Sequence, residues 1–207
     1  PIYLNVAAAV KLQGVTITSS RTGVSAAHIC NANATLTVSD TTFTGDVLVE
    51  AGSLLVGANV TVSGDIHQTG GLVEDNGAVT FNALRSLGGN LVLSDSSVVG
   101  SLILEGGNVR LTGAVQVTRL DVLSGSLSIE NAAVISDLYL AKGNTVALSG
   151  DGVGASAAVA NAEISSPSAP ITQTFSRQGT SSPSSLKIAR ICPATGAGSS
   201  KEDLSVS

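Results

Sequence analysis

The 207-residue chain contains no methionine and no tryptophan, and aromatic residues make up only 2% of it. Charged residues are also scarce at 12%, about half the usual share. A composition this apolar and weakly charged excludes an intrinsically disordered chain and a coiled coil. Ten basic residues against fifteen acidic ones give a net charge of −5, which excludes nucleic-acid binding by charge. No apolar run approaches the roughly 20 residues that span a bilayer, so we expect no membrane span.

Cysteine is equally rare, with only Cys30 and Cys192 present. Because an initiator methionine is missing, we expect a processed product or a fragment from which any signal peptide has been removed. This processing and the low lysine content favour a secreted or cell-surface location, where disulfides persist. We predict a disulfide between Cys30 and Cys192 that ties the tail to the start of the chain. The alternative is a pair of free buried thiols.

The apolar residues, 43% of the chain, are arranged in a repeat. The segment 35–143 divides into six rows: 35–52, 53–71, 72–89, 90–107, 108–125 and 126–143. Five rows have the same length, and the row 53–71 is longer by a single residue. Each row ends in glycine, at Gly52, Gly71, Gly89, Gly107, Gly125 and Gly143. Since only 23 of the 207 residues are glycine, a column of six is not a chance event.

Apolar residues recur within each row as three pairs, each with its members two positions apart. Over the six rows these columns hold 36 residues, of which 30 are apolar. In the row 108–125, for example, Leu120 and Val122 form the third pair. The exceptions are Thr42, Thr44, Gln68, Asp75, Ser86 and Ser97.

This spacing predicts the fold. Two apolar residues two positions apart point to the same side of a strand. Each row therefore predicts three short strands and three corners, and glycine fits a corner at which the backbone turns with a positive φ. The predicted fold class is all-β, a parallel β-helix solenoid with triangular coils of about 18 residues and about seven coils. The alternative, a β-sandwich of hairpins, requires Asn-Gly or Asp-Gly turns about every 8–12 residues, and these are not periodic here.

The Leu-x-Leu and Val-x-Val pairs with a corner glycine, as in the row 90–107, resemble parallel β-helix repeat proteins. That group includes the pectin-lyase-like superfamily, β-helical adhesins and the polymer-forming bactofilins. The pairs are spaced six, five and then seven residues apart, which fits a right-handed helix better than the left-handed hexapeptide pattern. The resemblance covers about half the chain and concerns the fold, so it implies no activity.

The composition changes along the chain and suggests three segments. We expect irregular N-terminal strands and a first coil in residues 1–34, and the regular β-helix in residues 35–149. Residues 150–207 form a Ser/Pro/Gly-rich C-terminal tail that contains four of the five prolines. Because parts of this tail are apolar and β-like, we expect it to pack partly on the helix.

Catalytic side chains do not converge in the sequence. β-Helical enzymes that cleave polysaccharides need clustered Asp with a Lys or Arg base, whereas here the nearest set is Asp65, His67 and Arg85. His28-x-Cys30 is too small a set for a structural zinc site, which takes four ligands. We therefore expect no enzyme, no cofactor and no metal, and a polysaccharide-active enzyme ranks third among the functions.

Outward threonines raise the question of ice binding, which requires a Thr-x-Thr ladder maintained from coil to coil. The motif occurs at residues 16–18, 35–37 and 42–44. On the first strand, however, Ser53 and Leu55 occupy the outward positions of the second row. The ladder is not maintained there, and we do not expect ice binding.

Other outward residues indicate an assembly surface. On the third strand, Leu48, Ile103 and Tyr139 occupy one outward column, and Leu87 and Leu123 occupy the adjacent one. Outward apolar residues collected on one face need a cover. The tail, a neighbouring subunit or a ligand could supply it.

The N-terminal segment, with Ile2, Leu4 and Val6, is apolar and strand-like rather than a polar cap. Uncapped strand edges invite pairing with another copy, here the last coil of a neighbour around Val146 and Leu148. Such a head-to-tail contact propagates unless it closes into a ring. We therefore predict an extracellular structural protein, a homopolymer that builds a filament, a sheath or a surface layer.

The alternative function is a glycan-binding adhesin or fibre domain that does not polymerise. Its partner would be a surface glycan. Two sequons, at Asn33 and Asn59, are candidate glycosylation sites in a chain that passes through a suitable secretory pathway.

Overall fold

A computed structural model of the chain describes residues 1–21, 23–130, 133–141, 146–149, 158–164, 176–177, 187–188 and 191–193. Side chains are described up to residue 141, except residues 22 and 130–132. The described residues form strands and turns and contain no helix. Accordingly, this part of the chain holds no helix of the length and apolar character that crossing a membrane requires.

The strands belong to two parallel sheets. The first sheet contains the second and third strands of each row, and its members are β1 (Ile2–Leu4), β3 (Thr16–Thr18), β4 (Ala27–Ile29), β6 (Thr42–Thr44), β7 (Val47–Val49), β9 (Thr61–Gln68), β11 (Thr80–Ser86), β13 (Val98–Leu104), β15 (Gln116–Val122), β17 (Val134–Leu140), β19 (Ala158–Ile164), β21 (Lys187–Ile188) and β22 (Ile191–Pro193). The second sheet contains the first strand of each row: β2 (Ala9–Gln13), β5 (Thr35–Ser39), β8 (Ser53–Val56), β10 (Leu72–Asp75), β12 (Asn90–Leu93), β14 (Asn108–Leu111), β16 (Ser126–Glu130), β18 (Val146–Ser149) and β20 (Ser176–Arg177).

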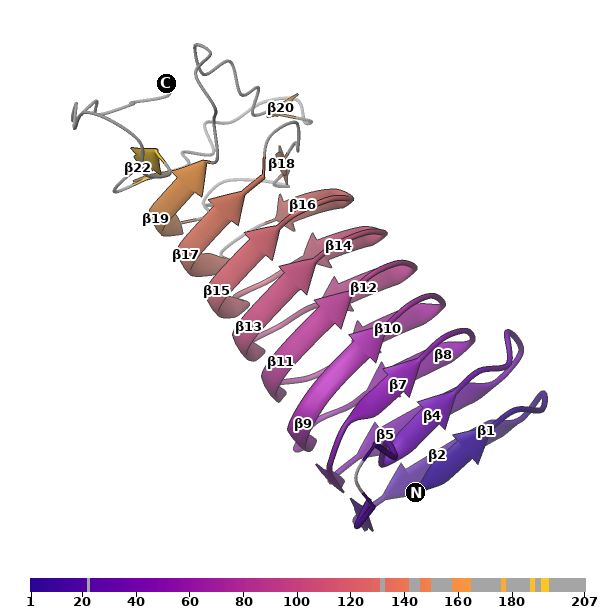
Figure 1. Cartoon of the computed structure of the whole chain (residues 1–207). Coiled ribbons are helices and arrows are strands. Elements are labelled where there is room, and N and C mark those ends of the chain that lie inside the picture. Colours follow the sequence, from indigo (N-terminus) through magenta and orange to yellow (C-terminus); the bar gives the residue numbers. More distant parts are fainter. Residues whose placement is uncertain are drawn as a thin grey trace.

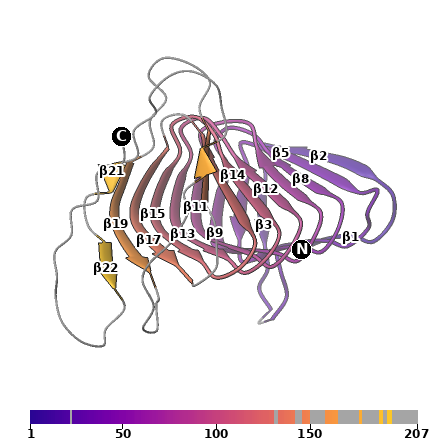
Figure 2. The same ribbon diagram turned by 90° about the horizontal axis from the view of Figure 1, so that it is seen from above.

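Successive coils stack in register, as the repeat predicts. Leu72 pairs with Asn90, Asn90 with Asn108, and Asn108 with Ser126, and each step is one full row of the repeat. Figure 1 shows the resulting rod, which runs from β1 at the indigo end to β19 and β22 at the other. Viewed from above, the coils lie behind one another around a shared interior (Figure 2). The chain is therefore a parallel β-solenoid, and the predicted fold class is confirmed.

The inward columns form the core. Leu102, Leu120 and Leu138 are direct register partners and are all buried. Two predicted inward residues are wrong, because Thr42 and Thr44 are exposed and Phe43 is buried between them. In this row Thr41 and Phe43 face inward, so compared with the row 72–89 its first corner is one residue shorter and its second corner is one residue longer.

The four remaining exceptions to the apolar pattern do point inward, as buried polar groups. Gln68 Nε2 donates to the carbonyl oxygens of Gly71 and Asn90 at 3.2 and 2.8 Å. The hydroxyl of Ser86 donates to the Gln68 Oε1 atom at 3.4 Å, and that of Ser97 donates to Gly77 O at 3.0 Å. All of these hydrogen bonds except the one to Gly71 run between coils, and together they offset the cost of burying polar atoms in the core.

Asp75 is the exception among them. Asp75 is the register partner of Val56 in the preceding coil, in a column of side chains that face inward. It is only 1% exposed. Its Oδ1 atom accepts hydrogen bonds from the backbone N–H and the hydroxyl of Ser94, whereas Oδ2 is buried with no hydrogen-bond partner. Desolvation raises the pKa of this carboxyl, although the hydrogen bonds from Ser94 act in the opposite direction.

The glycine column lies at the predicted corner. Gly52, Gly71, Gly89, Gly107 and Gly125 all have a positive φ, from 69° to 96°. A Cβ atom on Gly107 would come within 2.5 Å of the carbonyl oxygen of Gly89 in the preceding coil. Stacking and backbone conformation therefore both require glycine there. Gly143 lies outside the described residues.

The second corner differs from the expectation of three separate strands. From β9 to β17 the second and third strands of a row are continuous, so their corner is a bend within one strand. The additional residue of the row 53–71 is accommodated at this bend, where the register between β9 and β11 shifts at Phe81/Ala83.

Candidate functional site

The first, second and third strands of successive rows form three faces of the rod, which are numbered accordingly. The third face carries the outward ladder of residues that the sequence predicts. Leu48 pairs with His67, His67 with Arg85, Arg85 with Ile103, and onward to Asp121 and Tyr139. The same ladder extends toward the N-terminus, where His28 precedes Leu48 and Tyr3 precedes His28.

The apolar members of this face do not form a continuous stripe. Leu48, Ile103 and Tyr139 are half-buried, and charged or imidazole side chains separate them along the ladder. Leu87 and Leu123, in the adjacent column, are 44% and 41% exposed. Glu105 lies one coil from each of them, so the face is mixed rather than apolar.

Of the three residues nearest to a polysaccharide-cleaving site, Arg85 and Asp65 contact side chains outside the set. Arg85 forms a bidentate ion pair with Glu105, with nitrogen–oxygen distances of 2.8 to 3.1 Å. The carboxylate of Asp65 accepts a hydrogen bond from Asn82 Nδ2 at 3.5 Å. Among the described residues, His67 stands in register with Arg85 but forms no ion pair with a carboxylate.

A threonine ladder does exist, on the second face rather than the first. Because Thr42 points outward, it continues a column that begins at Thr16 and passes through Thr61 to Thr80. All four threonines are exposed. The column ends at Val98, its next register partner, so the hydroxyl ladder covers only the N-terminal coils.

The N-terminal coil has an open edge within the described residues. Here β1 pairs only with β4, β2 only with β5, and β3 only with β6. Of the three apolar residues predicted for this surface, Leu4 is buried, Ile2 is half-buried and Val6 is 60% exposed.

The predicted partner of this edge lies inside the sheet rather than at its end. Val146 and Leu148 belong to β18, which pairs with β16 on one side and with β20 on the other. The stack therefore continues past β18, and among the described residues the outer strands at this end are β20, β21 and β22. The side chains of Val146 and Leu148 lie outside the described ones.

The predicted disulfide is not formed in this structure, in which Cys30 is a free cysteine. Cys192 belongs to β22, which pairs with β19 at the C-terminal end of the stack, whereas Cys30 follows β4 near the N-terminal end. A disulfide requires Cα atoms within about 7 Å, and the intervening coils of one chain separate these two positions by far more. The side chain of Cys192 lies outside the described ones.

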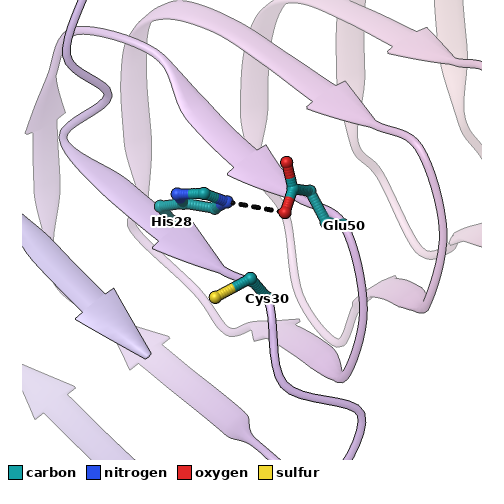
Figure 3. A group of neighbouring side chains, drawn as sticks. All are labelled: His28, Cys30 and Glu50. Atoms are coloured by element: carbon teal, nitrogen blue, oxygen red, sulfur yellow. Dashed lines mark ion pairs between the residues drawn. The ribbon is translucent and has the colours of Figure 1, made fainter. Parts of the chain in front are cut away.

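Cys30 instead belongs to a cluster of three potential ligand residues. A nitrogen of His28, the sulfur of Cys30 and a carboxylate oxygen of Glu50 all lie within 4.8 Å of one another. Figure 3 shows the imidazole of His28 facing the carboxylate of Glu50, with the thiol beside them. Stacking of adjacent coils creates this cluster, since His28 and Cys30 belong to one coil and Glu50 to the next.

Tyr3 adds a fourth side chain beside the cluster. Its ring packs edge-on against the His28 imidazole, with ring centroids 4.9 Å apart. A hydrogen bond between the Tyr3 hydroxyl and Cys30 raises the pKa of the phenol. Cys30 also donates to the Leu4 carbonyl oxygen at 3.5 Å, so contacts to β1 hold the thiol in place.

Sequence reasoning found His28 and Cys30 but missed Glu50. The rows began at residue 35, so residues 28 and 30 had no defined register with the following coil. In the structure, Ile29 O accepts a hydrogen bond from the Glu50 N–H at 2.8 Å. Extending the third-strand column back by one further coil would have placed Glu50 beside Cys30.

Both sequons lie at the surface. Asn33 is exposed in the turn before β5, and its N–H donates to Asn31 Oδ1 at 2.9 Å. Asn59 is exposed with a φ of 58°, and its Nδ2 atom donates to Asp40 Oδ1 at 2.9 Å. Whether either asparagine carries a glycan stays a prediction.

The geometry places the chain in one fold class, the parallel β-solenoids. No protein-family model matches the chain, and no curated protein or solved structure matches it significantly.

Proposed function

We propose that the protein is an extracellular structural solenoid that assembles end to end into a filament, a sheath or a surface layer. The open edge of the first coil is the single observation that carries this proposal. Three strands there are each paired on one side only within the described residues. Their unpaired N–H and C=O groups need water or another strand as a partner.

The outer strands of a second copy are the partner with matching chemistry. At the opposite end of the stack, β20, β21 and β22 are the last strands that the described residues form, and all are parallel to their neighbours. A second molecule in the same orientation would continue both sheets. Such a contact is heterologous and propagates as a filament unless it closes into a ring.

The open edge can be blocked at a single residue. Thr35 N–H donates to Ala8 O, and Gly14 N–H donates to Ser39 O, so the even-numbered residues around β2 face β5. Because successive backbone groups point to alternate edges of a strand, the N–H of Lys11 faces the open edge. Proline is tolerated in a strand where its missing N–H faces outward.

We therefore expect Lys11→Pro to abolish polymer formation and to leave the coils folded, as judged by circular dichroism. Lys11→Ala is the matched control, since it removes the same charge and keeps the N–H. Sedimentation velocity should show large species for the unmodified chain and for Lys11→Ala, and monomer for Lys11→Pro. If the unmodified chain sediments as a monomer at high concentration, the glycan-binding adhesin becomes the better explanation.

A further inference from the structure

The His28, Cys30 and Glu50 side chains offer three different donor atoms at one point on the third face. Imidazole nitrogen, thiolate sulfur and carboxylate oxygen are the three donor types that bind Zn²⁺ in proteins. We propose that these residues bind a divalent transition-metal ion of the Zn²⁺ class, with Tyr3 as a supporting residue. This site is independent of the proposed assembly.

The separations between the donor atoms are close to those of a loaded site. Around a tetrahedral Zn²⁺ ion, bonds of about 2.0–2.3 Å place the ligand atoms about 3.5 Å apart. The three donors already lie within 4.8 Å of one another, and Glu50 Oε2 is 3.1 Å from His28 Nε2. A contraction of about 1 Å is therefore sufficient. The Glu50 side chain is 48% exposed, so rotation of its carboxylate can supply this movement.

The buried ring nitrogen of His28 is a second, independent indication of a metal site. Its Nε2 atom is buried and has no hydrogen-bond partner, although the Glu50 carboxylate is at ion-pair distance. The two observations are compatible, because the 3.1 Å contact lacks the alignment that a hydrogen bond requires. A buried polar atom without a hydrogen bond is costly, and a metal ion at this point would satisfy it.

The surroundings also fit a metal site. Ligands in such sites are held in place by contacts beyond the metal. Here the Tyr3 ring packs edge-on against the imidazole of His28, with ring centroids 4.9 Å apart. The mixed nitrogen, sulfur and oxygen set favours Zn²⁺ or Co²⁺ over Mg²⁺ or Ca²⁺, which prefer oxygen ligands alone. Three protein ligands leave one position for water or an added ligand.

The test is titration of the full chain, kept reduced, with Co²⁺ and then with Zn²⁺. One equivalent of Co²⁺ should produce thiolate-to-cobalt charge-transfer absorption, and Zn²⁺ should abolish it. Cys30→Ser should remove this absorption, and Glu50→Gln should weaken Co²⁺ binding by at least about tenfold. Cys192→Ser and His67→Ala are the matched controls and should bind as the unmodified chain does.

Three outcomes would overturn the proposal: no charge-transfer absorption in the unmodified chain, absorption that survives Cys30→Ser, or unchanged affinity in Glu50→Gln. Glu50 is exposed at the edge of the cluster, so its substitution tests the site even if Cys30→Ser fails to fold. Circular dichroism in metal-free buffer establishes that each variant keeps the solenoid. Zn²⁺ should raise the melting temperature of the unmodified chain and not that of Cys30→Ser.

Discussion

The effect of a substitution in this molecule depends on the ladder to which the residue belongs, that is, on its register partners in the neighbouring coils. Leu102, Leu120 and Leu138 are stacked in register and each is at most 3% exposed, so a change at one position is felt in the coils on both sides. The carboxyl of Asp75 stands in such a ladder and lacks a partner for one oxygen. Position within a ladder therefore decides whether a polar residue is tolerated.

Leu120→Asp should be strongly destabilising, because it buries an unpaired charge at a fully buried position. We expect a loss of at least about 3 kcal/mol in the free energy of unfolding, measured by urea denaturation. Leu123→Asp, at a nearby position that is 41% exposed, is the control and should change stability by less than about 0.5 kcal/mol. Equal effects of the two substitutions would show that the assigned register is wrong.

Asp75 should make stability fall as the pH rises. Its carboxyl has a raised pKa in the folded chain, so in the interval above the ordinary pKa of 3.8 the folded chain holds a proton that the unfolded chain has lost. Binding more protons when folded means that the free energy of unfolding decreases with increasing pH across this interval. Asp75→Asn should remove this decrease and stabilise the chain at neutral pH, as measured by urea denaturation at several pH values. Glu74→Gln, at the outward neighbour, should leave the decrease in place.

The repeat predicts the strands more reliably than it predicts the geometry of the corners between them. The strands and their inward columns could be predicted because apolar pairs recur with a fixed glycine. The row 35–52 shows the limit, since it keeps the common row length while its two corners exchange one residue and turn Thr42 and Thr44 outward. A period fixes the length of a coil but not how that length is divided among corners.

The candidate site shows a second limit to what the repeat can predict. His28 and Cys30 were visible in the sequence, but Glu50 enters only through pairing between coils. Residues 1–34 do not follow the period of the later rows, because the register partners Ala9 and Thr35 are separated by more than the length of one row. Without a constant period there, the sequence could not show which side chains meet.

Glycine at the corner should be required for two separable reasons. Gly107 has a φ of +77° and would place a Cβ atom 2.5 Å from Gly89 O, whereas Gly14 has a φ of +67° and nothing within 4 Å. Gly14→Ala should therefore cost only the backbone term of about 1–2 kcal/mol. Gly107→Ala should cost more, because the stacked coil must also move apart. Thermal denaturation of the two variants checks this order, and equal losses would contradict the stacking argument.

At the scale of the whole molecule, a stack of parallel coils has two ends that differ from its sides. Every interior strand finds hydrogen-bond partners in the coils on either side, whereas the strands of the first coil have a partner on one side only within the described residues. The outward third face is mixed in charge and apolar character, so it offers a weaker contact than the open end does. This difference favours growth along the rod over lateral association.

Electron microscopy of the unmodified chain at high protein concentration tests end-to-end assembly most directly. The account predicts unbranched filaments one solenoid wide, in which the coils continue along the filament axis with strands about 4.8 Å apart. Isolated rods of single-chain length, in preparations that retain residues 1–10, would contradict it.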